Sequence, residues 1–389
     1  MSSGTGDEPG YEQPMRVKWT ILGLILMGCG PPRHAGRLVV GVGPTPEAVV
    51  EALTPAQAAP VVADWGQRTG RWAGLSPLAR PEVVWTNMLP GPIVHPITTD
   101  GDTIYAVAAG NVYALDPGGI KRWTARIQAA GPAVASEVGI IVPRADGRLA
   151  LLNPGSGAIE KETGPGGLTH GIPTVLEGVM AWVTTDGVLA TSDGGRQQIA
   201  TTGLSDIASD GQRLYVGTIA GELMAVDRTG IVWSQRLPGP AVAHPVLSAD
   251  TVYMTYGAGG GMPGGVAAVS REDGTLRWTS SMRVGPSAGP ALGNVLVVPG
   301  KSGELVAMDA SHGGIRWRTP GYGPFTVKPL VVGGTVFAGN ADGRVHRVDL
   351  DDGGEAWALD LGATITGDPI LIQGRLVFGL TDGRLVCLK

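Results

Sequence analysis

The sequence has very few cysteines, few aromatic residues and no excess of positive charge. Its 389 residues include two cysteines, Cys29 and Cys387, which excludes a framework of disulfide bonds. Aromatic residues make up 5% of the chain, and the net charge is -5. Proteins that bind nucleic acid phosphates carry a basic surface, so we expect no nucleic-acid partner. Cys387 stands in an apolar strand and is interpreted as a small buried residue.

The metalloprotease and thiol-redox motifs are missing as well. No His-Glu-x-x-His or Cys-x-x-Cys occurs, and the six histidines are spread singly along the chain. The glycine-rich stretch 256–265 lacks the strand-to-helix context that a phosphate-binding loop requires, and is interpreted as a hairpin tip. The sequence therefore predicts no catalytic residues, no metal site and no bound cofactor.

The N-terminal segment has the pattern of a signal peptide. Arg16 and Lys18 precede an apolar run over 19–27, which is too short to span a bilayer. The polar residues ahead of Met15 suggest that Met15 is the true start of translation. Residues 30–63 are rich in proline and alanine and predict a flexible linker. We therefore divide the chain into 1–29, 30–63 and 64–389.

The tetrapeptide that ends the signal segment, Leu26-Met27-Gly28-Cys29, resembles the lipobox of bacterial lipoproteins. The resemblance implies that the Cys29 thiol is lipidated, which anchors the chain to a membrane because each buried methylene contributes about 0.8 kcal/mol. Gly30 stands where an aspartate would signal retention in the inner membrane, so the outer membrane, on its periplasmic side, is the expected location. The alternative is an ordinary signal peptide with a chance cysteine.

Glycine and proline are abundant, with 63 and 30 copies, and they punctuate a repeated unit. From residue 64 onward the unit combines apolar strands, an Asp-Gly or Gly turn, an Ala-x-Asp phrase and a terminal tryptophan. A period of about forty residues with four short strands is typical of β-propellers. The prediction is an all-β chain that forms an eight-bladed β-propeller of four-stranded antiparallel blades over 64–389. An α-solenoid would need a helical periodicity, which these segments lack.

A tryptophan ends five of the eight units, and a sixth ends the segment ahead of the first unit. On the outermost strand of a blade, its large ring can cover the seam to the next blade, so we predict a structural, blade-docking role. The six residues are Trp85, Trp123, Trp233, Trp278, Trp317 and Trp357. In the two degenerate units, Lys161 and Ile199 stand at the same spacing.

The last unit stops at 384–389, after its third strand. The segment Pro81–Trp85, ahead of the first unit, ends as an outermost strand does. We predict that it pairs with residues 385–388 and closes the ring, which removes an exposed sheet edge. Asp64-Trp65 and Arg71-Trp72 are expected to cap the same junction.

A second pattern precedes the proline that opens the innermost strand of each unit. Innermost strands line the central channel, and this position is polar in several units. Its polar members are His95, Asp206, His244, Lys328 and Asp368. Such a ring could form a binding site for a small anion or a peptide end at one mouth of the channel. The alternative is that these are solvated loop residues with no common task.

The Ala-x-Asp-x-x-x-Gly-x-x-x-Trp phrase resembles the tryptophan-docking repeat of the pyrroloquinoline quinone (PQQ) propeller superfamily over about 64–389. One branch comprises quinoprotein dehydrogenases, which use a quinone, calcium and typically a vicinal cysteine pair. The other comprises BamB-type outer-membrane assembly lipoproteins. The sequence has no vicinal cysteines, and stretch 256–265 offers no carboxylate for calcium.

The resemblance therefore implies a membrane-anchored, non-catalytic scaffold without a cofactor. Its expected partners are other envelope proteins, including the β-barrel assembly machinery, with the chain as a monomer within a larger complex. A PQQ-dependent dehydrogenase and a ligand-binding sensory propeller are the alternatives.

Overall fold

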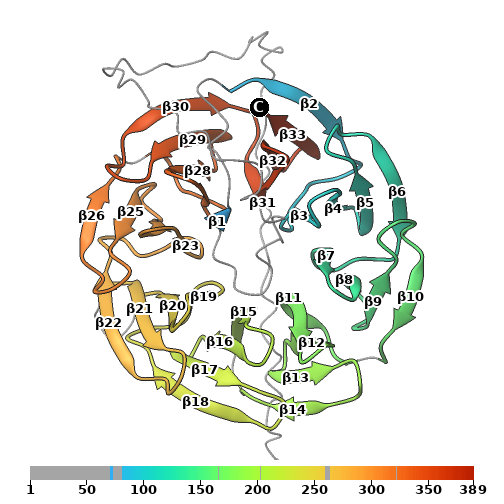
Figure 1. The fold of residues 1–389 in the computed structure, drawn as a ribbon, viewed down its shortest axis with the longest axis horizontal. Helices are drawn as coiled ribbons and strands as arrows, with labels where there is room; N and C mark the ends of the chain where they lie inside the picture. Colours follow the sequence, from blue (N-terminus) through green and yellow to red (C-terminus); the bar gives the residue numbers. More distant parts are fainter. Residues whose placement is uncertain (1–70, 73–80, 165, 202, 259–262, 321) are drawn as a thin grey trace, which may run out of the picture. The chain divides into compact units, whose positions relative to one another are not determined.

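The computed structural model describes residues 81–164, 166–201, 203–258, 263–320 and 322–389, together with the backbone of 71–72. The signal segment, the linker, Cys29 and Asp64-Trp65 lie outside the described residues. Within the described part, eight sheets form a ring around a central channel, and no α-helix occurs. No described helix could therefore cross a membrane. The prediction of an all-β, eight-bladed propeller is confirmed (Figure 1).

The first four blades follow one another along the chain, each from its innermost to its outermost strand. Blade 1 consists of β3 (Thr98–Thr99), β4 (Ile104–Ala108), β5 (Asn111–Leu115) and β6 (Lys121–Arg126). Blade 2 consists of β7 (Val134–Ser136), β8 (Gly139–Pro143), β9 (Leu149–Leu152) and β10 (Ile159–Glu162). Blade 3 consists of β11 (Thr169–Leu176), β12 (Val179–Thr184), β13 (Val188–Thr191) and β14 (Arg196–Gln198). Blade 4 consists of β15 (Leu204–Ser209), β16 (Leu214–Thr218), β17 (Glu222–Val226) and β18 (Ile231–Arg236).

The second half of the ring repeats this order until the last blade. Blade 5 consists of β19 (Val246–Leu247), β20 (Thr251–Tyr256), β21 (Gly265–Ser270) and β22 (Leu276–Ser281). Blade 6 consists of β23 (Ala291–Leu292), β24 (Leu296–Pro299), β25 (Leu305–Met308) and β26 (Ile315–Arg318). Blade 7 consists of β27 (Leu330–Val332), β28 (Thr335–Gly339), β29 (Arg344–Asp349) and β30 (Glu355–Asp360). Blade 8 consists of β31 (Ile365–Ile372), β32 (Arg375–Leu380), β33 (Arg384–Leu388) and β2 (Val83–Met88).

Blade 8 takes its outermost strand from the other end of the propeller. β2 runs antiparallel to β33, with Trp85 opposite Cys387 and Asn87 opposite Leu385. Beyond the strand, the backbone N–H groups of Glu82 and Lys389 each donate to the other residue's carbonyl at 2.9 Å. The predicted closure of the ring by the segment ahead of the first unit is therefore confirmed.

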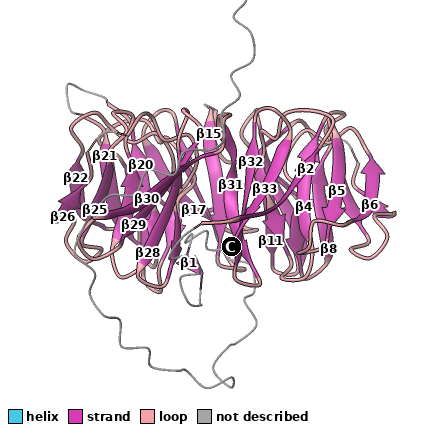
Figure 2. Ribbon diagram, turned by 90° about the horizontal axis from the view of Figure 1, so that it is seen from above, coloured by secondary structure: helices cyan, strands magenta, loops and turns pink. Residues whose placement is uncertain are grey.

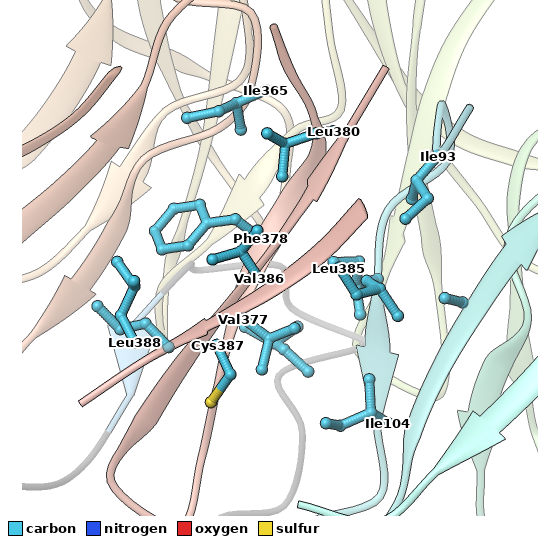
Figure 3. Packing of buried hydrophobic residues seen from close by; sticks show 14 of the residues in the cluster. Ile93, Ile104, Ile365, Val377, Phe378, Leu380, Leu385, Val386, Cys387 and Leu388 are labelled. Carbon is cyan, nitrogen blue, oxygen red and sulfur yellow. The ribbon is translucent and has the colours of Figure 1, made fainter. Parts of the chain in front are cut away.

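The core beside this junction joins blade 8 to its neighbours. Cys387 is fully buried there among apolar side chains of β32 and β33, and burial raises the pKa of its thiol to about 11. Val377 and Leu385 lie on the side of Ile93 and Ile104 (Figure 3). Cys387 thus behaves as the small buried residue that its apolar strand predicts.

The prediction for Arg71-Trp72 is wrong. These two residues form β1 (Arg71–Trp72), which pairs parallel with β27, placing Arg71 opposite Val331. β27 is the innermost strand of blade 7, so β1 adds a fifth strand at the channel side of that blade and does not cap the junction of β2 with β33. The inner edge of β27 carries backbone groups that a further strand can pair, whereas β2 alone completes blade 8.

Tryptophan rings join one blade to the next at five described seams. In each, the indole N–H of an outermost strand donates to a carbonyl in the turn before the last strand of the following blade. The pairs are Trp85 with Pro117 at 3.0 Å, Trp123 with Pro154 at 2.8 Å, Trp233 with Arg271 at 3.0 Å, Trp278 with Ala310 at 3.1 Å and Trp317 with Leu350 at 2.9 Å. Trp357, the sixth, is 3% exposed and packs beside Phe337.

Each of these turns contains a glycine beneath the ring. At Gly353, φ is 77°, and an added Cβ would lie 2.6 Å from the Trp317 ring. Glycine is required here on both counts, because other residues rarely adopt positive φ and their Cβ would displace the indole. Ring and turn therefore form one interlocking contact, in which the glycine of one Gly-x-x-x-Trp phrase receives the tryptophan of the preceding blade.

The two degenerate units differ from each other. Ile199 is buried in the core between blades 3 and 4 and does not occupy the docking position, so the spacing was misleading there. The last strand pair of blade 3 lacks the bulge that the other blades have, which places Gln197 opposite Leu189 and beside Gly230 of blade 4. Lys161 does lie at the docking position of blade 2, and its side chain is exposed.

The strands stand across the thickness of the ring, and the loops gather at its two faces (Figure 2). The outermost strands form the rim, so successive side chains alternate between an exposed outer face and a buried inner face, as in β6 and β18. Binding surfaces of such a ring are its two faces, its rim and the channel mouths.

We predict that Trp317→Ala lowers the free energy of unfolding by about 3–5 kcal/mol, because it removes a buried ring from the seam between blades 6 and 7. Gln197→Ala, at the equivalent position of blade 3, serves as the matched control and should change it by about 0.5 kcal/mol. Urea unfolding followed by tryptophan fluorescence measures both. Equal losses in the two variants would contradict a docking role for the ring.

Candidate functional site

The residues predicted to ring the channel mouth lie next to the same position of a neighbouring blade. The backbone N–H of Lys328 donates to Asp368 Oδ1 at 3.0 Å, which joins blades 7 and 8. A Cβ added to Gly367 would lie 3.2 Å from the carbonyl oxygen of His95, at the step from blade 8 to blade 1. These contacts run between adjacent blades, so the polar residues follow one another around the innermost strands.

The other two predicted residues are placed in the same way. The His244 ring packs against Gly289 of blade 6, where an added Cβ would lie 2.8 Å from Nε2. Asp206 of blade 4 packs against Gly171 of blade 3 so closely that a Cβ there would clash with its carboxylate. Each of these two side chains thus faces a glycine of a neighbouring blade, which leaves room for it.

Burial gives these side chains an environment different from that of exposed loops. His244 is 7% exposed, and His95, Asp206, Lys328 and Asp368 are half-buried. Burial lowers the pKa of His95 below its ordinary value of 6.5, because the charged imidazolium loses solvation. His95 is therefore neutral at neutral pH, with one ring nitrogen free to donate and the other to accept a hydrogen bond.

A second polar cluster, which the sequence did not predict, joins blades 4 and 5. Arg271 reaches back across the seam, with its Nη2 2.6 Å from Asp210 Oδ2 and its guanidinium 5.7 Å from the centre of the Tyr215 ring. Arg271 Nη1 also donates to the Ser248 carbonyl at 2.6 Å. The cluster lines a cleft of about 300 Å³. We call it the Arg271 cluster.

The charged groups of the Arg271 cluster satisfy one another. The Tyr215 hydroxyl donates to Asp210 Oδ2 at 2.9 Å. Burial raises the pKa of Asp210, but the N–H of Arg213 and the Arg271 guanidinium outweigh burial and hold it below its usual value. A carboxylate and a guanidinium that neutralise each other have little charge left for a ligand, so this arrangement acts as a clamp between blades.

The sequence did contain a signal for half of this clamp. Asp210 and Tyr215 are five residues apart, as are Asp100 and Tyr105 in blade 1, where the hydroxyl donates to the carboxylate at 2.7 Å. The aspartate turn and the tyrosine therefore recur as a unit. Arg271 belongs to another blade, and no local pattern connects it with Asp210.

The described residues form no site for a metal or a metal-dependent cofactor. Within the described ranges, no three His, Cys, Asp or Glu side chains are grouped so that they could hold a metal ion. The quinone and calcium of the dehydrogenase branch require such oxygen ligands. The described residues do not fit that group.

The sequence matches a protein family described as outer membrane protein assembly factor BamB. The match covers residues 108–198, 194–262 and 262–389, which together span most of the propeller. The chain belongs to this family. No curated protein matches the sequence.

Solved structures similar to this BamB-family chain share its fold at low sequence identity. BamB from Moraxella catarrhalis has a TM-score of 0.67 and 17% identity, covering 79% of this chain and 97% of its own. The computationally designed protein Ika8 has a TM-score of 0.65 and 14% identity, covering 77% and 98%. Quinohemoprotein alcohol dehydrogenase from Comamonas testosteroni has a TM-score of 0.65 and 13% identity, covering 86% and 81%.

These likenesses concern the fold alone. The same ring occurs in an assembly factor, in a designed protein and in an alcohol dehydrogenase, so the architecture by itself does not determine the activity. The predicted resemblance to the PQQ-like propeller superfamily and to BamB-type proteins is confirmed.

We predict that the His95 ring titrates below 6.5 in the folded protein. The unfolded state then binds more protons than the folded state as the pH falls. The contribution of His95 to the free energy of unfolding therefore decreases as the pH is lowered from about 7 to about 5. Ring-proton NMR measures the titration, and urea unfolding at both pH values measures the linkage. His95→Gln should lose part of this pH dependence. A titration at or above 6.5 would contradict the burial argument.

Proposed function

We propose that the protein is a non-catalytic scaffold that binds other proteins of the bacterial envelope, including proteins of outer-membrane protein assembly. The observation that carries this proposal is the family match over 108–389. The likeness to BamB from Moraxella catarrhalis, which covers 97% of that chain, supports it. A closed ring held by repeated seam contacts supplies a rigid surface, which binding partners can use without a cost of ordering.

The membrane attachment in this proposal rests on the sequence. Cys29 follows the signal segment in a lipobox-like tetrapeptide, and we propose that its lipidated thiol holds the chain at the periplasmic side of the outer membrane. The linker 30–63 then separates the membrane from the propeller. The family description, which names outer-membrane assembly, supports this location.

The channel mouth is the proposed place for a small ligand, namely an anion or the carboxylate end of a peptide. Lys328 supplies a cation. Asp368 lies beside it in blade 8, and His95 follows at the same position of blade 1. An anion held near the His95 ring favours the imidazolium and raises its pKa. The His95 titration repeated with an added acetylated peptide would therefore report occupation as an upward shift.

A PQQ-dependent dehydrogenase is the second candidate, favoured by the likeness to the alcohol dehydrogenase over 86% of this chain. It ranks below the scaffold because the described residues offer no ligand set for the metal that accompanies the quinone. A sensory propeller that binds a ligand in its channel is the third candidate. Alcohol-dependent dye reduction by purified protein supplied with quinone and calcium would establish the second candidate.

We predict that affinity purification from detergent-solubilised membranes recovers the wild-type protein together with outer-membrane assembly proteins. Cys29→Ala should shift the protein to the soluble periplasmic fraction and reduce co-purification at least several-fold, because the lipid anchor raises its local concentration at the membrane. Immunoblotting of the fractions and mass spectrometry of the eluates measure both. Membrane retention of Cys29→Ala would contradict the anchor, and an eluate without assembly proteins would contradict the partner class.

A further inference from the structure

We propose that the seam between blades 2 and 3 is a docking site for an aromatic side chain of a partner protein. The proposal rests on the scaffold function and names the chemistry that one part of the surface recognises. It starts from a contrast within the ring: five seams contain an indole over a turn glycine, and this seam has the turn without the indole.

The turn of blade 3 has the same backbone structure as a turn that receives an indole. In blade 1, the N–H of Asp116 donates to the Ile120 carbonyl at 2.8 Å, and the N–H of Gly119 donates to the Asp116 carbonyl at 2.9 Å. In blade 3, Thr191 bonds to Gly195 at 2.9 Å, and Gly194 bonds to Thr191 at 3.0 Å. Gly194 therefore corresponds to Gly119, which lies under the Trp85 ring.

The space above Gly194 is open. Its φ is 97°, and an added Cβ would meet no heavy atom within 4 Å, whereas one at Gly119 would lie 2.7 Å from the Trp85 ring. Lys161, which stands at the docking position of blade 2, is exposed, and Leu151 opposite it is half-buried. The site thus consists of a bare glycine turn beside an apolar side chain.

The core behind this opening is small. Of the described apolar clusters, the one between blades 2 and 3 has the fewest fully buried members, which are Ile141, Leu149, Met180, Trp182 and Ala190. The Trp182 indole N–H is buried there without a hydrogen-bond partner. Leu168, in the loop between the two blades, is 54% exposed. Leu168 and the Trp182 donor lie at the end of the seam away from the Gly194 turn, because Gly166 and Leu168 bond to the β8–β9 and β12–β13 turns. They indicate a thinly packed seam and are not part of the ring position itself.

The neighbouring seam is covered in another way. Between blades 3 and 4, Gln197 lies beside Gly230, and Arg228 forms ion pairs with Asp193 and Glu177. In contrast, the described ion pairs of Arg144 and Arg148 connect them to carboxylates of their own blade 2. Of these two seams, the described residues leave the position open only between blades 2 and 3.

The five filled seams define the occupant. They hold a flat aromatic ring over the glycine and a donor against the turn carbonyl that corresponds to Ser192 in blade 3. All four residues of β10 are exposed, so an extended segment can approach along the rim and place one ring in the site. Aromatic anchors of this kind commonly dominate the energetics of protein interfaces.

The probe for this site is N-acetyl-tryptophanamide, added to the full chain labelled with 15N-glycine. The Gly194 signal is assigned by its loss in Gly194→Asn, since asparagine tolerates positive φ. We expect the probe, but not N-acetyl-alaninamide, to shift this signal, with the weak affinity of a single ring. Lys161→Trp should abolish the shift and raise the thermal midpoint, because its own indole fills the position. Lys161→Phe is the second variant if Lys161→Trp folds poorly.

Gln197→Trp is the matched control, because it adds an indole at the next seam and should leave the Gly194 response unchanged. No response in the wild type, or a response that survives in Lys161→Trp, would overturn the proposal. A wild type that self-associates while Lys161→Trp stays monomeric would assign the site to a second copy and overturn the partner assignment.

Co-purification separates this inference from the function beneath it. Loss of assembly partners from Lys161→Trp, with Gln197→Trp retaining them, supports the site. Equal recovery by Lys161→Trp and wild type overturns the site and leaves the scaffold function standing. A Gly194 response without any co-purified protein contradicts the scaffold function instead.

Discussion

The pairing of β2 with β33 is the interaction on which the rest of the ring depends. It places Trp85 opposite Cys387 within blade 8, and the Trp85 ring then bonds to Pro117 of blade 1. One strand therefore completes the last blade and joins it to the first. Without it, blade 8 would have three strands and an exposed edge, and the seam to blade 1 would lose its ring.

Closure also explains why unequal seams are tolerated. In an open array each seam would have to hold the following blades alone, whereas in a ring every blade is held from both sides. The Arg271 cluster and the indole contacts strengthen some seams, and the seam at Lys161 has neither. A closed ring can thus keep one seam open for a partner. That freedom connects the architecture to the proposed scaffold function.

Much of the fold could be predicted because the repeat is local. Each Ala-x-Asp, glycine turn and tryptophan lies within one hairpin, and the missing last strand identified its substitute. Contacts that cross between blades were harder to predict. Gln197 was missed because the absence of a bulge changed the register of blade 3, and Arg71-Trp72 because their partner strand β27 lies some 260 residues away. Arg271 and Asp210 are separated by 61 residues with no shared motif.

Native-state hydrogen exchange of the β2 amides tests the closure most directly. The β2 amides that pair with β33, such as that of Asn87 opposite Leu385, should exchange with the same opening free energy as amides of β32. The reason is that detaching β2 opens the ring. Exchange of β2 at the rate of a frayed terminus, while β32 keeps full protection, would contradict the central place of this strand.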